Sequence, residues 1–199
     1  MRELNVVTAK SLKIAGSLAM ASAFLTLPLA YLSFTLEGRS DVYVNEIQTI
    51  IQAFGTTLFV AIVLFFKRFL NALFIFHDTD RTILLMAAGS VVTGALAISL
   101  YSFPALKETL GYALIVVLVL LGIVQAQFGY KLFRLSNDLG GMLKPFCYAN
   151  MAIGILLATV VLIPLSIPVS ALSDLMLGTI FFNRAKNIKG QQRIEGAAG

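Results

Sequence analysis

The chain has 199 residues, of which 58% are hydrophobic and 13% are charged, and its mean hydropathy is +0.88. Soluble domains contain roughly 45–50% apolar and about 25% charged residues, so this composition excludes an ordinary soluble domain and predicts an integral membrane protein. The net charge of +5 lies beside hydrophobic runs, which favours topology signals and anionic-lipid contacts over nucleic acid. The single cysteine, Cys147, excludes an internal disulfide and any multi-cysteine metal or iron–sulfur site.

Five charge-free apolar runs follow one another along the chain: 14–36, 47–66, 82–106, 109–130 and 145–173. A helix crosses the bilayer core in roughly 20 residues. The first four runs fit one crossing each, whereas the fifth is too long for one. We therefore expect an all-α bundle of transmembrane helices. It forms a single polytopic domain over 1–190, followed by a flexible C-terminal tail over 191–199.

The first run raises the alternative of a cleaved signal peptide, because a basic segment precedes it and small residues follow. The apolar sequence continues without interruption through FLTLPLAYLSFTL, so the whole run of 23 residues is long enough for a full span. We therefore interpret this segment as a retained first helix.

The segment that begins at the end of the second run, FKRFLNALFIFHD, carries apolar residues at helical spacing with cations between them. This pattern is typical of an amphipathic helix in the cytoplasmic interface, or of a bent extension of the second span. The residues expected to anchor it at the interface are Phe66, Lys67, Arg68, Phe69 and Phe74.

The following loop contains His77, the only histidine, between phenylalanine and aspartate. With Asp78 and Asp80 it could form at most a weak cation site. We favour a simpler role, in which Asp78, Thr79 or Asp80 caps the third helix.

The fifth run contains LIPLSIPVSALSD, with Pro164 and Pro168 four residues apart. Proline lacks an N–H group and disfavours helical geometry in the preceding residue, so the pair favours a chain reversal between two helices, over about 146–163 and 169–183. The alternative is one long helix that kinks at the prolines.

Basic residues separate these alternatives. The N-terminal segment and the four loops between runs carry three, one, three, one and three Lys or Arg residues, and the tail adds Arg184, Lys186, Lys189 and Arg193. Basic residues beside short loops remain cytoplasmic. A reversal places the tail with the other basic segments, which predicts six transmembrane helices in three hairpins with both termini cytoplasmic. Five spans with a Pro-kinked last helix remain the alternative.

Small residues four apart, such as Ala15 and Ala19, Gly122 and Ala126, and Gly154 and Ala158, predict close helix packing within the bundle. The same faces could support a homo-oligomer.

Polar residues inside the runs are the best functional lead. Gln48, Gln52 and Thr56 form a stripe on the second helix, and Asp174 lies about 9 Å inside the outer end of the returning helix. We favour hydrogen bonding between helices over an outward-facing pathway for these residues. The expected partners of Asp174 are Gln52, Tyr101, Ser102 and Lys107.

No catalytic, cofactor-binding or metal-binding motif is evident in the sequence. The composition resembles that of many small polytopic proteins of the bacterial inner membrane, but it identifies no family. We therefore expect a non-catalytic accessory, assembly or scaffold subunit of a membrane complex, with a membrane-protein partner or a second copy as partner. The alternative is a small-solute or ion transporter with an outward-facing polar cavity, and an enzyme acting on lipids has the least support.

Overall fold

The computed structural model describes residues 7–36 and 42–197, and these residues form six α-helices. The helices are α1 (Ala9–Leu36), α2 (Val42–Phe74), α3 (Asp80–Ser102), α4 (Lys107–Leu132), α5 (Leu143–Ala158) and α6 (Ile163–Ala197). Two 3₁₀ turns, η1 (Pro104–Leu106) and η2 (Leu139–Gly141), precede α4 and α5. All helices except α5 are long and apolar enough to span a membrane. The predicted all-α membrane bundle is confirmed.

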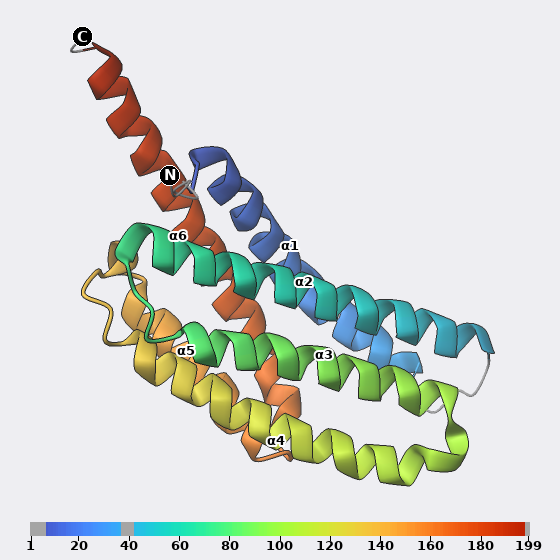
Figure 1. The fold of residues 1–199 in the computed structure, drawn as a ribbon. Helices are drawn as coiled ribbons and strands as arrows, with labels where there is room; N and C mark the ends of the chain where they lie inside the picture. The colour runs from blue at the N-terminus through green and yellow to red at the C-terminus, as the bar shows by residue number, and fades with distance from the viewer. Residues whose placement is uncertain (1–6, 37–41, 198–199) are drawn as a thin grey trace, which may run out of the picture.

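The six helices close into a ring. Each helix packs against the next one along the chain, and α6 packs extensively against α1 (Figure 1). Because the first and last helices are neighbours, the side chains that face inward from all six helices meet at the centre of the bundle.

One end of the bundle collects most of the loops that carry basic residues. The start of α1, the α2–α3 and α4–α5 loops and the C-terminal part of α6 lie together at this end, whereas η1 lies at the other (Figure 1). We call the first the basic end; its cations include Lys67, Arg81, Lys131, Lys144 and Arg184.

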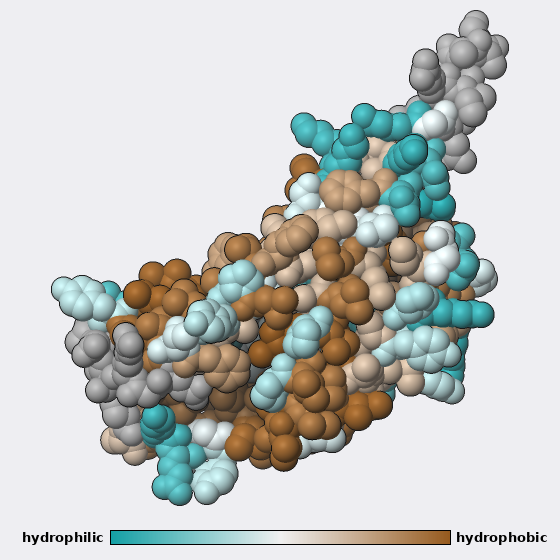
Figure 2. Space-filling view, turned by 180° about the vertical axis from the view of Figure 1, so that it is seen from behind, coloured by the Kyte–Doolittle hydropathy of each residue, from teal (hydrophilic) through white to brown (hydrophobic). Residues whose placement is uncertain are grey.

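The surface between the two ends is apolar. Figure 2 shows hydrophobic residues covering the middle of one face, with hydrophilic residues gathered toward the extremities. Large exposed hydrophobic side chains include Phe24, Tyr31, Val116, Ile155 and Leu172. Contact with lipid removes the cost of exposing such side chains to water, so this belt agrees with membrane insertion.

The chain reverses between α5 and α6, but not on the prolines. The turn occupies residues 159–162, where Val160 has a φ of 57°, and both prolines lie inside α6. Pro164 is the second residue of α6, where a backbone N–H has no partner within the helix, so proline suits the position. Pro168 removes a single hydrogen bond one turn later. The short helix is therefore α5, with 16 residues, and not the returning helix.

The segment after the second run continues α2 without interruption, and the helix ends at Phe74. The expected interfacial anchor needs correction, because Phe66 and Phe69 are buried in the core of the bundle. Lys67 is half-buried and pairs with Asp80 at 3.9 Å, Arg68 is exposed, and the ring of Phe74 lies 5.2 Å from the Arg184 guanidinium. The aromatic residues face the helices packed around α2, because α1, α5 and α6 also reach the basic end.

Thr79 occupies the cap position of α3, but its side chain makes no capping hydrogen bond. Asp80 instead accepts hydrogen bonds from the Asn71 amide at 2.9 and 3.0 Å and lies 3.2 Å from His77 Nδ1. These contacts join the end of α2 to the start of α3. The carboxylate expected to cap a helix ties the two helices together.

Small residues bring helices into close contact in two places. In α4 and α5, a Cβ added at Gly122 would lie 2.6 Å from the Gly154 carbonyl oxygen; in α1 and α6, one added at Gly16 would lie 3.3 Å from the Gly178 carbonyl oxygen. The Gly122–Gly154 pair holds α4 against α5, and the Gly16–Gly178 pair holds α1 against α6.

Helix α6 remains helical to Ala197, so the segment expected as a C-terminal tail begins as part of this helix.

Candidate functional site

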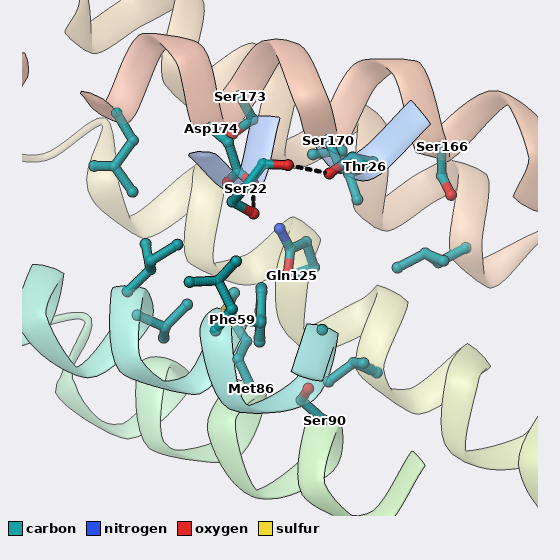
Figure 3. Close-up of a pocket in the computed structure, with 18 of the residues that line it drawn as sticks. Ser22, Thr26, Phe59, Met86, Ser90, Gln125, Ser166, Ser170, Ser173 and Asp174 are labelled. Atoms are coloured by element: carbon teal, nitrogen blue, oxygen red, sulfur yellow. Dashed lines mark hydrogen bonds between the residues drawn. The ribbon is translucent and has the colours of Figure 1, made fainter. Parts of the chain in front are cut away.

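A cavity of about 430 Å³ lies at the centre of the ring, and every helix contributes to its wall (Figure 3). Small-molecule sites commonly enclose roughly 300–1,000 Å³. Protein interiors are normally close-packed, with few voids larger than a water molecule. The space is partly open to the surface and is large enough for a small molecule.

One wall of the cavity is polar and comes from α1 and α6. On α6, Ser166, Ser170, Ser173 and Asp174 follow one another at helical spacing, so that they share one face. Ser22 on α1 lies against Asp174 (Figure 3). The tight α1–α6 contact places these side chains opposite one another.

Among the residues that the structure describes, Asp174 is the only Asp, Glu, Lys or Arg that lines the cavity. The Ser22 hydroxyl donates a hydrogen bond of 2.7 Å to Oδ2. Within residues 7–36 and 42–197, Oδ1 has no hydrogen-bond partner, and no lysine or arginine nitrogen lies within 4.0 Å of the carboxylate. The acid therefore has one oxygen open to the cavity and no counter-charge within that part of the chain.

A second polar network joins α4, α5 and α6. The Gln125 amide donates to Asn150 Oδ1 at 2.8 Å, and the Asn150 amide donates to Ser173 Oγ at 3.1 Å and to the Phe146 carbonyl at 2.9 Å. All three side chains are buried. Ser173 and Asp174 are adjacent, so the network fixes the rotation of α6 that points Asp174 into the cavity.

The remaining wall is mostly apolar, although Gln52 of α2 and Ser90 of α3 also line it. Phe59 and Met86 lie across the cavity from Asp174 (Figure 3). Other apolar lining residues on α2, α4 and α5 are Leu58, Ile62, Val63, Leu118, Leu121, Ile153 and Leu157. The cavity is therefore amphipathic: most of its hydroxyl groups and its carboxylate lie on α1 and α6, and most of its apolar side chains lie on α2, α4 and α5.

Phenylalanines close the cavity toward the basic end. The Phe66 ring packs edge-on against Phe128, Phe146 and Phe181, with centroids 5.6 to 6.2 Å apart. Phe69 continues the cluster, since its centroid is 5.3 Å from that of Phe181. Together with Leu177 these rings separate the cavity from the basic end of the bundle.

The cavity reaches the surface between α1 and α2. Leu25, Phe54 and Gly55 are the lining residues that are exposed, and all three lie along this seam. A Cβ added at Gly55 would have no neighbour within 4 Å, so the seam is open at that point.

The structure brings together only two of the four polar residues singled out from the sequence. Gln52 and Asp174 line the cavity, whereas Gln48 is buried outside its wall and Thr56 packs against Gly94 of α3. Because α6 starts at Ile163, Asp174 lies about 16 Å along the helix and not about 9 Å from its end.

Ser22 holds Asp174, in place of the expected partners. The sequence does not indicate Ser22 as a partner, because this residue lies within a run of small residues that indicates helix packing. Gln125 of α4 is buried, whereas Gln127, two residues further on, is exposed. Both glutamines lie in the same apolar run, and the sequence does not show which of them faces the bundle. The contact of Gln125 with Asn150 does.

The described residues contain no group of three or more His, Cys, Asp or Glu side chains that could hold a metal ion. Comparisons with known proteins gave no match to a family model, to a curated protein or to a solved structure. Function must therefore be argued from the cavity itself.

Proposed function

We propose that the protein is a membrane carrier that binds a small amphipathic solute in the central cavity. The observation that supports this proposal is the cavity of about 430 Å³, in which serine hydroxyls and the Asp174 carboxylate face a mostly apolar wall. An accessory or scaffold subunit needs only a filled bundle and an outer docking face. A charged group within a membrane helix is costly and commonly marks a solute or ion pathway.

The basic residues support a cytoplasmic basic end in the cell membrane. In this orientation the phenylalanine cluster closes the cytoplasmic side, and the cavity faces the outer half of the membrane. A carrier must open each side in turn around a central site. The Phe66 cluster is then the cytoplasmic gate, and release of solute requires these rings to separate.

The proposal is tested by flux. Purified protein is reconstituted in liposomes, which are incubated with a small-metabolite extract, and the metabolites accumulated inside are identified by mass spectrometry. Ser170→Phe fills the cavity, because Ser170 is a lining residue. Leu172→Phe is the matched control, because Leu172 is exposed on another face of the same helix.

We expect at least one metabolite to accumulate with the unaltered protein and with Leu172→Phe, but not with Ser170→Phe. Equal accumulation in all liposomes, with or without protein, contradicts a carrier. A stoichiometric protein partner retained in mild detergent, together with absent flux, would instead support the accessory-subunit hypothesis.

A further inference from the structure

Four hydroxyl groups that line the cavity on α1 and α6 have their hydrogens already engaged. Ser22 donates to Asp174, Thr26 donates to the Ser22 carbonyl at 2.7 Å, and Ser170 donates to the Ile167 carbonyl at 2.8 Å. Ser166 likewise donates to the Ile163 carbonyl at 2.6 Å. A hydroxyl that has donated its hydrogen retains oxygen lone pairs that can only accept. These four hydroxyl groups therefore present hydrogen-bond acceptors to the cavity.

Asp174 adds a carboxyl group to the same wall. In the described part of the chain its Oδ1 has no hydrogen-bond partner, and no other Asp, Glu, Lys or Arg lines the cavity. An ionised carboxylate away from water is costly unless a cation is near. A ligand anion would be repelled, and a neutral ligand would leave the carboxylate uncompensated.

The geometry points to a small organic cation, a protonated amine that carries an apolar group, as the ligand of this cavity. Its ammonium donates hydrogen bonds to Asp174 Oδ1 and to the hydroxyl oxygens of α1 and α6. Its apolar group lies against Phe59 and Met86 on the opposite wall (Figure 3). This inference rests on the proposed function and specifies the chemical class of its solute.

Three probes of matched size and different charge test the inference. They are 2-phenylethylammonium, 2-phenylethanol and 3-phenylpropanoate, each measured by equilibrium binding to the intact protein in lipid nanodiscs. We expect saturable binding of the cation that is at least about tenfold tighter than that of the alcohol, and no saturable binding of the anion.

Asp174→Asn should remove the preference for the cation over the alcohol, because the amide carries no charge. Asp174→Glu should retain it, which keeps the test decisive if the asparagine variant fails to fold. Glu108→Gln is the control: it makes the same charge change at an exposed residue of α4 outside the cavity wall, and the preference should survive.

Equal affinity for cation and alcohol in the unaltered protein overturns the inference and leaves the carrier standing. Binding of none of the probes, with flux of other metabolites in the liposome test, does the same. If both binding and flux are absent, the carrier and the inference fall together.

The exposed seam carries a second, independent inference. Leu25, Phe54 and Gly55 are exposed lining residues on α1 and α2, within the apolar belt of the bundle. We infer that the solute reaches the cavity sideways from the lipid, through this seam. A cation with an apolar group concentrates at the membrane surface, where such a route begins.

Gly55→Phe tests the route, because a Cβ at this position meets no neighbour within 4 Å and the ring can extend across the opening. Gly111→Phe is the matched control, since a Cβ there also meets no neighbour within 4 Å and Gly111 does not line the cavity. For 2-phenylethylammonium, or for a metabolite found in the flux test, association and dissociation should both slow by about tenfold or more in Gly55→Phe. The dissociation constant should change little.

Unchanged rates in Gly55→Phe overturn the lateral route. So does a faster dissociation with weaker binding, because it would show that the new ring displaces ligand from the cavity and does not obstruct its path.

Discussion

At the scale of single residues, two short networks determine what the cavity presents. Ser22 holds one oxygen of Asp174, and Asn150 connects Gln125 to Ser173. Both networks converge on neighbouring residues of α6. A single hydrogen bond of this kind adds little to the stability of a membrane protein. Removing one partner is costly, because it leaves the other buried group without a hydrogen bond.

Replacing Asn150 with leucine should destabilise the protein. The change leaves Gln125 and Ser173 without their buried partner, at a cost of about 1 to 3 kcal/mol for each stranded group, and thermal unfolding in detergent should occur at lower temperature. Gln127→Leu is the control, because Gln127 is exposed on the same helix as Gln125. An equal effect of the two changes would contradict the network.

The sequence indicated Asp174 as the important polar residue, because an acid inside a long apolar run is costly wherever the helix turns. It could not indicate Ser22 or Asn150. Serine and asparagine near small residues are equally compatible with lipid-facing, packing and site positions, and only the contact between α1 and α6 makes Ser22 the partner of Asp174.

At the scale of helices, the ring depends on close contact at small residues. Gly122 and Gly154 let α4 and α5 meet through their backbones. This role was predictable from the spacing of small residues. The position of the α5–α6 turn was not, because prolines are compatible both with a turn and with the first turns of a helix, and α6 uses them in the second way.

Gly154→Ala should be strongly destabilising. The added methyl group would lie 2.5 Å from the Gly122 carbonyl oxygen and 2.9 Å from Ala126 Cα, both backbone atoms of α4 that cannot move independently. Overpacking of this kind costs about 1 to 3 kcal/mol or more.

Gly111→Ala serves as control, because its methyl group meets no neighbour within 4 Å, and alanine favours a helix over glycine by about 1 kcal/mol. Thermal unfolding of both variants measures the difference. An unaffected Gly154→Ala protein would contradict the close contact of α4 and α5.

At the scale of the whole molecule, the number of reversals and the basic residues together predict orientation. The alternation of basic residues predicted the hairpin arrangement, and the loops expected to share a side do lie at one end of the bundle (Figure 1). The sequence did not predict that the six helices form a closed ring. Hydropathy identifies which segments enter the membrane, but it carries little information about which helices become neighbours.

Reporter fusions test the orientation. A fusion after Lys189 should report a cytoplasmic location, and one inserted between residues 39 and 44 should report an external one, because basic residues stay on the cytoplasmic side. A cytoplasmic location for the second fusion would invert the bundle and place the phenylalanine cluster at the outer side.

The central claim is that the ring encloses an accessible, solute-sized cavity beside Asp174, and thiol labelling tests it most directly. Cys147 is the only cysteine and is fully buried, so the unaltered protein provides the background rate. A new cysteine at position 170 should react with a small cationic thiosulfonate reagent much faster than this background and faster than one at Leu172, on another face of α6. At position 170 the cationic reagent should also react about tenfold or more faster than an anionic reagent, because the carboxylate attracts cations. Reaction of Ser170→Cys at the background rate with both reagents would show that the cavity is closed or filled, and would contradict the account.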